Sequence, residues 1–346
     1  MLKKIKSINL LRLKDKFLKE KLSVGLDIGA STIKLIKLEF LKEKPQLSFF
    51  SLEPVGNDLK AALKKIIDSQ GIKAVNISVS GPSTIIRYVN FPKMNNDELS
   101  QALKFEAQKH IPFSIEEVNL DSYILKHNLP DNKMLVLLTA VKKESLNQRL
   151  KLIEEAGLNT NVVDIDSIAL INAFNFSYSQ DDNLKTKASA LLNIGASLSN
   201  LNILEGGIPR LSRDIHIGGN NFTQKIQDLL SIDFKSAEEL KLNPDKERLD
   251  KVLPAIEAIL SNLAQEIRAS FDYYESQSVS SVVRIFLSGG GSLFTGLKDI
   301  LANLLGIEVE YWEPLKAINI SEGVDPQKIK ASSHQLAVAI GLALHS

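Results

Sequence analysis

Hydrophobic and polar positions repeat one pattern twice along the chain. Apolar runs at 24–28, 33–38 and 47–52 are separated by short polar turns, and matching runs occur at 190–194, 198–204 and 208–213. Short apolar runs bounded by glycine and polar residues predict β-strands. The pattern therefore predicts strand, tight turn, strand, turn, strand twice, and a duplication with such a long period indicates two similar lobes.

Helices are predicted between and after these strands, at 97–110, 221–230, 249–277 and 297–305. Pro112 is expected to stop the first of them. A shorter helix at 237–241 is expected to have Ser236 as its N-cap and Glu239 as its capping-box partner. The helix at 249–277 carries an apolar stripe that we expect to lie in the core. The stripe consists of Leu253, Ile256, Ile259, Leu260, Leu263, Ile267, Phe271 and Tyr274.

The first copy contains DIGASTIK at 27–34, and the second contains NIGASLSN at 193–200, 166 positions later (193 minus 27). Glycine lets the backbone approach a ligand closely, and successive amides in a turn form a nest for anionic oxygens. A glycine-containing hairpin explains either copy alone, but two copies at equivalent places favour two nests that grip a polyphosphate from both sides. The residues expected at the phosphates are Gly29, Ala30, Ser31, Thr32, Gly195, Ala196 and Ser197. Lys34 is a further candidate, although in a strand its side chain could equally face solvent.

A third glycine cluster lies in RIFLSGGGSLFTGLKDIL at 284–301. A strand, a tight glycine loop and a helix in this order often bring backbone close to a nucleotide. The Walker pattern is absent because no Gly-Lys-Ser/Thr follows, and no acidic residue completes a Rossmann unit. The candidate residues are Gly289, Gly290, Gly291 and Ser292, together with Gly218 and Gly219 before the helix at 221–230.

Composition and charge narrow the classes of protein. The chain has 346 residues, too many for one ordinary core, with 42 Lys plus Arg against 41 Asp plus Glu. This balance gives no overall attraction to nucleic acid. The absence of cysteine excludes disulfides and thiolate catalysis, and five scattered histidines argue against structural zinc. The longest apolar run, MLVLLTAV at 134–141, is too short to span a bilayer, and the start lacks a signal peptide, so we expect a soluble cytoplasmic protein.

Five motifs in this chain order resemble those of the actin-like ATPase superfamily. The two glycine turns resemble its phosphate loops, and LSGGGSLFTGL at 287–297 resembles its adenosine motif. DIDSIALINAF at 164–174 and LAVAIGLAL at 336–344 resemble its two connecting motifs. The resemblance implies an α/β actin-like ATPase fold with two lobes, each built on a duplicated mixed β-sheet core with helices. It also implies ATP and Mg²⁺ as cofactors.

The same resemblance implies roles for single residues. Asp27 would hold magnesium through water, and Asp166 would face the metal or the attacking water. Asn193 stands where the superfamily usually has an Asp that holds the metal's water shell, and Asn offers only a neutral oxygen. We therefore expect ATP binding with very slow hydrolysis, which Asn193→Asp should accelerate. Glu238 and Lys241 would face the adenosine.

Two other stretches resemble the type IV pilus assembly protein PilM family. They are FEAQKHIPFSIEEVNLDSYIL at 105–125 and LAQEIRASFDYYESQ at 263–277, and the resemblance extends from Leu22 onward. It implies an inserted subdomain in the first lobe, of the type found in PilM and the cell-division protein FtsA. The implied role is a cytoplasmic adaptor, peripheral to the inner membrane, that docks the N-terminal tail of PilN. It would couple the inner-membrane pilus complex to the motor ATPases.

The motifs divide the chain into five predicted parts. These are an N-terminal segment at 1–22, a first core subdomain at 23–79, 158–186 and 331–346, the inserted subdomain at 80–157, a second core subdomain at 187–226 and 282–330, and a helical subdomain at 227–281.

Plainer interpretations remain for several features. We interpret His110 as a helix-end residue and Phe91 and Phe113 as packing residues beside the partner groove. Asp164 and Asp166 are each compatible with a strand-end or helix-cap carboxylate, and Asp166 matches the acidic position of the connecting motif better. A sugar kinase would need a catalytic base for its substrate, and the sequence offers no candidate for one. The alternative is that the protein is an FtsA-like cell-division ATPase that forms filaments.

Residues 1–22 hold eight basic and two acidic side chains with an apolar stripe, which is typical of a helix on an anionic membrane surface. A solvated tail or a helix packed on its own fold is equally compatible. SINLLRL at 7–13 also resembles the PilN tail motif. In that hypothesis the segment competes with PilN for the groove beside residues 80–113.

Overall fold

The structure, a computed structural model, describes residues 21–41, 44–56, 58–185, 187–243 and 246–345. The described chain divides into two compact units. Unit 1 takes in the described residues up to Ser177, Leu315–Lys330 and those from Val338 onward, and unit 2 comprises Tyr178–Pro314 and Ala331–Ala337. The membrane-helix and tail-motif hypotheses rest on residues 1–20, which lie outside the described residues, while Lys21 and Leu22 begin the first strand.

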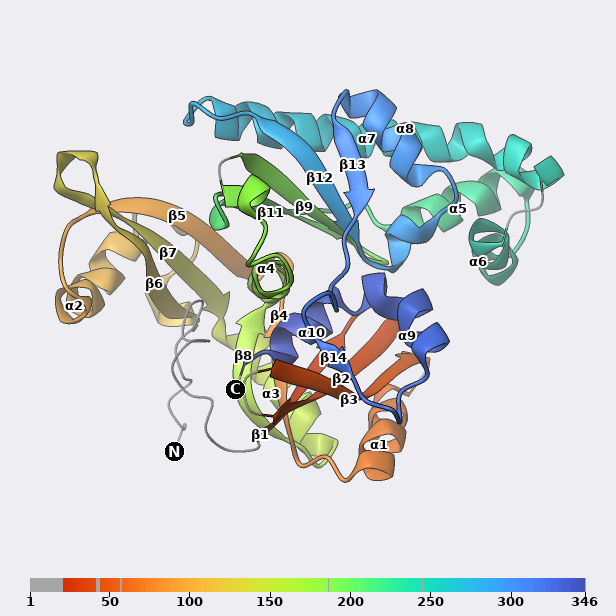
Figure 1. The fold of residues 1–346 in the computed structure, drawn as a ribbon, viewed down its shortest axis with the longest axis horizontal. Helices are drawn as coiled ribbons and strands as arrows, with labels where there is room; N and C mark the ends of the chain where they lie inside the picture. Colours follow the sequence, from red (N-terminus) through yellow and green to blue (C-terminus); the bar gives the residue numbers. More distant parts are fainter. Residues whose placement is uncertain (1–20, 42–43, 57, 186, 244–245, 346) are drawn as a thin grey trace. The chain divides into compact units, whose positions relative to one another are not determined.

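The described strands of unit 1 form a six-stranded mixed sheet in the order β14-β3-β2-β1-β4-β8 (Figure 1). β1, β2 and β3 are antiparallel neighbours, whereas β4 pairs in parallel with β1 and β8. The strands are β1 (Lys21–Ile28), β2 (Thr32–Leu41), β3 (Lys44–Pro54), β4 (Ala74–Val79), β8 (Asn159–Ile165) and β14 (Asn319–Ile320). The first three are the strands that the hydrophobic pattern predicts, each with longer bounds.

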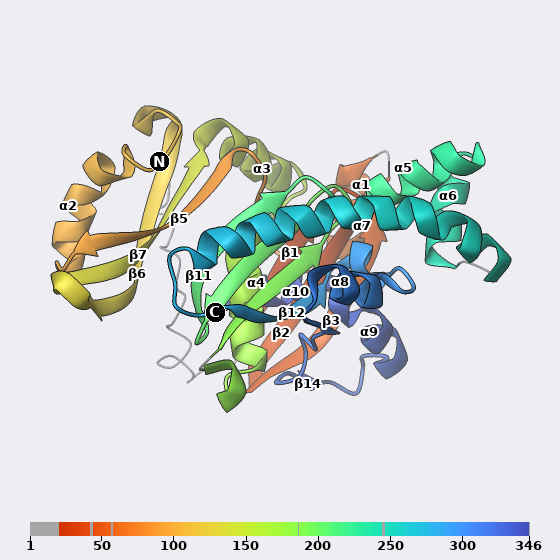
Figure 2. The same cartoon turned by 90° about the horizontal axis from the view of Figure 1, so that it is seen from above.

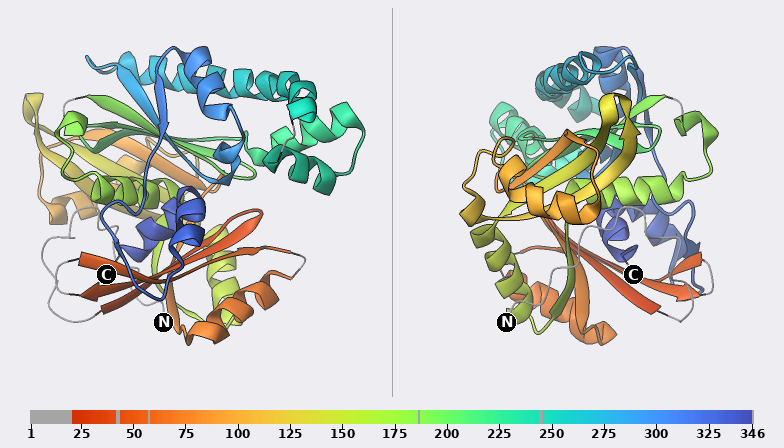
Figure 3. Two further views of the ribbon diagram at one scale, coloured as in Figure 1. Left: turned by 45° about the vertical axis from the view of Figure 1, so that its right-hand side comes forward. Right: turned by 90° about the vertical axis from the view of Figure 1, so that its left-hand side faces the viewer.

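Helices cover both faces of this sheet (Figure 3). They are α1 (Leu59–Gln70), α3 (Lys143–Glu155), α4 (Asp166–Ser177), α9 (Pro326–Ser332) and α10 (Ala337–Ala343). Leu63 of α1 and Ile153 of α3 belong to the core of one face. On the other face α10 crosses β1 so closely that a Cβ on Gly25 would lie 2.1 Å from the Ala339 carbonyl oxygen. The two predicted connecting motifs therefore form α4 and α10.

Between β4 and α3, the described chain forms a three-stranded antiparallel sheet, β5-β7-β6, with α2 beside it (Figure 2). The bounds are β5 (Thr84–Pro92), α2 (Asn96–Ala107), β6 (Val118–Leu129) and β7 (Lys133–Lys142). The prediction that this helix reaches His110 is wrong. It ends at Ala107, because the amides of Lys109 and His110 donate to the Glu106 and Ala107 carbonyls in tighter, three-residue turns.

The described strands of unit 2 repeat the strand order of unit 1. They form the sheet β11-β10-β9-β12-β13, in which β9, β10 and β11 are antiparallel and β12 pairs in parallel with β9 and β13. The strands are β9 (Ala188–Ile194), β10 (Ser199–Glu205), β11 (Ile208–Ile215), β12 (Val282–Ser288) and β13 (Glu308–Tyr311). This order corresponds strand for strand to β3-β2-β1-β4-β8, which confirms the predicted duplication.

The described helices of unit 2 are α5 (Gly219–Leu230), α6 (Phe234–Leu242), α7 (Lys246–Glu275) and α8 (Leu297–Leu305). The prediction of Ser236 as an N-cap is wrong. α6 begins earlier, at Phe234, because the Asp233 carboxylate caps it and accepts from the Ser236 amide at 3.0 Å. α7 also lies slightly earlier than the predicted 249–277. Within the described residues, every helix is too short or too polar to cross a membrane.

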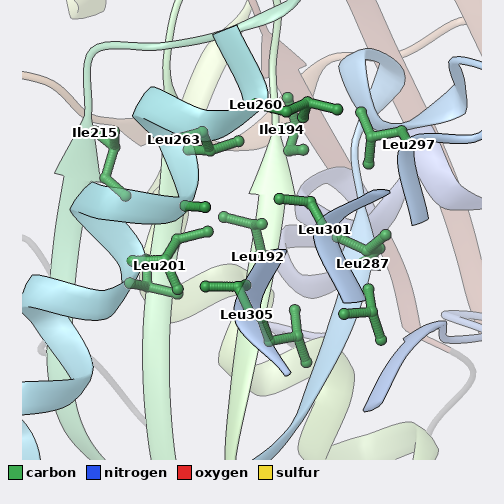
Figure 4. Packing of buried hydrophobic residues seen from close by; sticks show 14 of the residues in the cluster. Leu192, Ile194, Leu201, Ile215, Leu260, Leu263, Leu287, Leu297, Leu301 and Leu305 are labelled. Carbon is green, nitrogen blue, oxygen red and sulfur yellow. The ribbon is translucent and has the colours of Figure 1, made fainter. Parts of the chain in front are cut away.

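α7 and α8 cover one face of the five-stranded sheet and form the core of unit 2 (Figures 1 and 4). Leu260 and Leu263 of α7 lie over Leu192 and Ile194 of β9 (Figure 4). The predicted α7 stripe is confirmed, since every member is buried or packs against this core. Burial of each large aliphatic side chain contributes roughly 1.5–3 kcal/mol. This core holds the strand ends that carry the second glycine turn and the 289–291 loop.

Candidate nucleotide site

The two glycine turns have the same local geometry. In the hairpin between β1 and β2, the Gly29 amide donates to the Thr32 carbonyl at 3.1 Å. In the hairpin between β9 and β10, the Gly195 amide donates to the Leu198 carbonyl at 2.9 Å. The same turn therefore stands at equivalent places in the two units, as the duplication predicts.

Asp27 and Lys34 form an ion pair at the base of the first turn. They are direct partners in the β1–β2 ladder, and Lys34 Nζ lies 2.9 Å from Asp27 Oδ2. The Lys34 side chain is only 15% exposed, so it does not face solvent. The hydroxyls of Ser31 and Thr32 lie 3.4 Å apart at the exposed tip. A carboxylate, an ammonium group and two hydroxyls thus surround the first turn.

The second turn has amides where the first has an ion pair. Asn193 and Asn200 are direct partners in the β9–β10 ladder, and Asn193 Nδ2 donates to Asn200 Oδ1 at 3.2 Å. Asn193 Oδ1 accepts from the Ser288 hydroxyl, also at 3.2 Å. The glycine motif in the sequence points to Asn193 and not to Asn200, although the 166-residue offset makes Asn200 the counterpart of Lys34 (34 plus 166).

The second turn also packs against the start of α5. The amides of Gly219 and Asn220 donate to the carbonyls of Gly195 and Ala196, both at 2.8 Å. A Cβ on Gly218 would lie 2.7 Å from the Ala196 carbonyl oxygen. Close backbone packing therefore requires glycine here independently of any ligand, and it brings Gly218 and Gly219 to the turn.

The third glycine cluster, at 289–291, packs against the second glycine turn. Gly289 has φ 88°, and its amide donates to the His334 carbonyl at 2.7 Å. The Ser292 hydroxyl donates to the Gly289 carbonyl at 2.7 Å, which closes the predicted loop as a short 3₁₀ turn. A Cβ on Gly291 would lie 2.7 Å from the Gly195 carbonyl oxygen. The structure thus brings the glycines of the second turn, α5 and the 289–291 loop together within unit 2.

Lys241 and Glu238 of α6 border this cluster. Lys241 is buried, and its Nζ donates to the Gly219 carbonyl at 3.2 Å, to Thr223 Oγ1 at 2.9 Å and to Glu238 Oε2 at 2.6 Å. Burial lowers the pKa of Lys241, and the Glu238 carboxylate offsets this only in part. Thr223 is a contact that the sequence did not indicate.

The two acidic residues of the first connecting motif differ in their surroundings. Asp164 is buried, accepts from the Ile165 amide at 2.7 Å and lies 2.6 Å from His345 Nε2. Asp166 begins α4 and is half-buried. Burial alone would lower the pKa of His345, but the charge and hydrogen bond of Asp164 outweigh burial and raise it. Asp164 is therefore engaged by His345.

The residues of the two glycine turns fit a polyphosphate better than a directly bound metal. Within the described residues, no three His, Asp or Glu side chains gather into a metal site. The first turn instead presents the Lys34 ammonium group and the Ser31 and Thr32 hydroxyls. Magnesium would be held through its water shell, with Asp27 as the nearby carboxylate.

The inserted subdomain carries a second candidate surface. A pocket of about 470 Å³ is lined by Lys93, Met94, Asn95, Asn96 and His127. On α2, Phe105 is 72% exposed. Phe91 and Phe113 pack in the subdomain core, and His110 lies in the turn after α2, 6.4 Å from the Phe91 ring. The packing interpretation of Phe91 and Phe113 is confirmed, whereas His110 lies three residues beyond the last residue of α2.

The strand order of the two sheets and the paired glycine turns define a protein of the actin-like ATPase fold. The chain is similar to the ethanolamine utilization protein EutJ from Carboxydothermus hydrogenoformans, with a TM-score of 0.55 and 14% identity, over 98% of this chain and 95% of that one. It is also similar to a PilM–PilN type IV pilus biogenesis complex, with a TM-score of 0.82 and 27% identity, over 94% of this chain and 98% of that one.

The chain belongs to the family of the type IV pilus assembly protein PilM, whose profile matches residues 25–346. Both the fold class and the family that the sequence indicated are therefore confirmed. The FtsA-like alternative is not favoured by this match.

Proposed function

We propose that this protein is a nucleotide-binding adaptor of the type IV pilus inner-membrane complex, which docks the N-terminal tail of PilN. The observation that carries the proposal is the similarity to the PilM–PilN complex along almost the whole of both chains. Such similarity in a family of pilus assembly proteins favours the same kind of partner.

We propose ATP with magnesium as the nucleotide. Its phosphates are proposed to lie at the two glycine turns, at 29–32 and 195–197. The adenosine would lie at the glycines of 289–291 with Ser292, beside Glu238 and Lys241. Two observations support this proposal: the identical turn geometry in both units, and the convergence of three glycine segments with a buried lysine in unit 2.

Hydrolysis is proposed to be slow at most. Asn193 supplies a neutral amide where an Asp would strengthen the hold on magnesium, and phosphoryl transfer depends on such positioning and charge. Nucleotide occupancy would then mark a state of the adaptor, with PilN affinity as its output.

The proposed docking surface for the PilN tail is the inserted subdomain, beside residues 80–113. Phe105 offers an exposed aromatic side chain on α2, and Met94 lies in the lining of an open surface pocket. Aromatic residues are enriched among the residues that anchor protein–protein interfaces.

The deciding experiment is a pull-down of the full-length protein with a PilN N-terminal tail peptide, with and without ATP. We expect binding by the wild type and at least a tenfold loss of affinity for Phe105→Ala or Met94→Ala. Tyr273→Ala is the matched control, because Tyr273 is an exposed aromatic residue (58%) on α7. No binding of the tail by the wild type in either nucleotide state would refute the adaptor function. ATP-dependent light scattering without tail binding would favour the filament alternative.

Two finer proposals concern location and assembly. Residues 1–22 are proposed to contact the inner membrane, and the complex is proposed to reach the motor ATPases. Co-sedimentation with anionic liposomes that disappears on removal of residues 1–21 would support the first of these.

A further inference from the structure

A row of four polar side chains crosses the sheet of unit 2 at the base of the second glycine turn. Ser288 of β12 is paired with Asn193 of β9, Asn193 with Asn200 of β10, and Asn200 with Asp214 of β11. Directly paired residues point to the same face of a sheet. This face is opposite to the leucine-rich core shown in Figure 4, since the neighbours Leu192, Leu201, Ile215 and Leu287 all belong to that core.

Hydrogen bonds connect the row from end to end. The Ser288 hydroxyl donates to Asn193 Oδ1 at 3.2 Å, and Asn193 Nδ2 donates to Asn200 Oδ1 at 3.2 Å. Asn200 Nδ2 then donates to Asp214 Oδ1 at 2.7 Å. Ser288 and Asn200 are buried, while Asn193 and Asp214 are half-buried. Each donor points in the same direction along the row, towards the carboxylate.

The carboxylate sets this direction. A carboxylate accepts hydrogen bonds and donates none, so Asn200 must turn its NH₂ group towards Asp214. The carbonyl oxygen of Asn200 then faces position 193, where only a donor can satisfy it. Asn supplies that donor, and Asp does not. Buried polar groups left without a partner cost stability, so an Asp at 193 would be disfavoured.

Unit 1 has the same strand pairing at the base of its turn, but its third strand carries no acid at the matching position. Asp27 corresponds to Asn193, and Lys34 corresponds to Asn200, because both lie 166 positions earlier. Lys34 donates to Asp27, and its partner on the third strand is Leu52 rather than an acid. In unit 1, Lys34 can only donate hydrogen bonds, and no acid on the third strand fixes its orientation. The acid Asp27 is therefore accommodated opposite Lys34.

We propose that Asp214, acting through Asn200, is the positioning residue that makes position 193 a hydrogen-bond donor and so excludes a carboxylate from the second glycine turn. The neutral residue in this turn is then the consequence of a hydrogen-bond row that spans four strands. The effect on magnesium rests on the proposed function, whereas the coupling between positions 193 and 214 does not.

The row is tested by thermal unfolding of four full-length proteins without nucleotide: wild type, Asn193→Asp, Asp214→Asn and the double variant. Asn193→Asp places a carboxylate oxygen beside the Asn200 carbonyl oxygen, so two acceptors face each other without a hydrogen. The unfolding midpoint of this variant should therefore fall by about 5 °C. Asp214→Asn alone should change the midpoint by less than about 2 °C, since an amide oxygen still accepts from Asn200. In the double variant Asn200 can reverse, because position 214 now donates, and most of the loss should be recovered.

Asn193→Leu provides the control, because it removes the hydrogen bonds at this position without adding an acceptor. Asp214→Asn should not rescue Asn193→Leu. Equal rescue of both substitutions, or an Asn193→Asp protein as stable as the wild type, would overturn the proposal. Titration of ATP with and without magnesium then separates the two proposals. If no protein of the set binds ATP, the proposed nucleotide function fails. The unfolding midpoints of the four proteins still test the coupling between positions 193 and 214.

Discussion

Lys34 Nζ lies 2.9 Å from Asp27 Oδ2 across the β1–β2 ladder, at the base of the first glycine turn. Both side chains are largely buried, at 15% and 11% exposure. A phosphate that approached the turn would meet the ammonium group, and magnesium would meet the carboxylate. The pair therefore offers one charge for each component of a magnesium nucleotide. Substitution of Lys34 or of Asp27 removes one of these charges at a time.

Lys34→Met should weaken ATP binding by roughly tenfold to a hundredfold, because a charge-assisted hydrogen bond contributes about 1.5–3 kcal/mol. Calorimetric titration measures the change. Lys37→Met is the matched control, since Lys37 lies on the same strand away from the turn. Equal affinity of the Lys34 variant and the wild type would remove Lys34 from the nucleotide site.

Gly29→Val should sharply weaken ATP binding, because a branched side chain would occupy the space where the phosphate approaches. A Cβ at this position already meets Lys34 Nζ and the Thr32 carbonyl oxygen at 3.1 Å. Gly29→Ala is a milder variant that should fold and show an intermediate loss. Gly323→Val is the control, since its Cβ meets only Ser321 Oγ at 4.0 Å. Unchanged nucleotide affinity in the Val variant, measured by calorimetry, would contradict the assignment.

The family resemblance alone predicts that Asn193→Asp accelerates ATP hydrolysis. The polar row changes this expectation, since the new carboxylate would oppose Asn200 while Asp214 is present. We now expect little gain from Asn193→Asp alone and a rise of about tenfold or more in Asn193→Asp/Asp214→Asn. Phosphate release under single-turnover conditions measures the rate. Rapid hydrolysis by the wild type would contradict the proposed slow turnover.

The His345–Asp164 pair should make the stability of unit 1 depend on pH. The pKa of His345 is raised above its ordinary value of 6.5, so its stabilising charge is present in full below about pH 6.5 and is lost as pH rises through the folded-state pKa. His345→Gln keeps a donor for Asp164 but removes the charge. Its unfolding midpoint should fall below that of the wild type by roughly 3 °C at pH 6 and by much less at pH 9.

The double variant Asp164→Asn/His345→Gln is the control, because it should show no loss that is specific to low pH. A constant difference between His345→Gln and the wild type across this range would mean that the pair acts without charge.

Removal of residues 1–21 tests the competition hypothesis for the N-terminal segment. If the segment occupies the PilN groove, the truncated protein should bind a PilN tail peptide several-fold more tightly, because a competitor is absent. Equal peptide affinity in full-length and truncated proteins, measured by fluorescence anisotropy, would exclude competition.

The strands, the long helix and the duplicated turn followed from the sequence because their signals are local. Apolar alternation and glycine placement at 24–52 and 190–213 record which residues face a core and where the chain must bend. The errors lay at helix ends, where Asp233 caps in place of Ser236 and α2 ends at Ala107. Competing side-chain caps and tight turns differ there by small energies, so pattern alone does not decide them.

The sequence by itself determined the family, the glycine segments and the unusual Asn193. Only the tertiary structure decided which side chains meet: Asn193 with Asn200 and Asp214, Lys241 with Gly219, and Asp164 with His345 across 181 positions. These contacts depend on strand register and on helices that pack from distant parts of the chain. A shift of one residue in register reverses the face of every side chain, so only the assembled core can determine them.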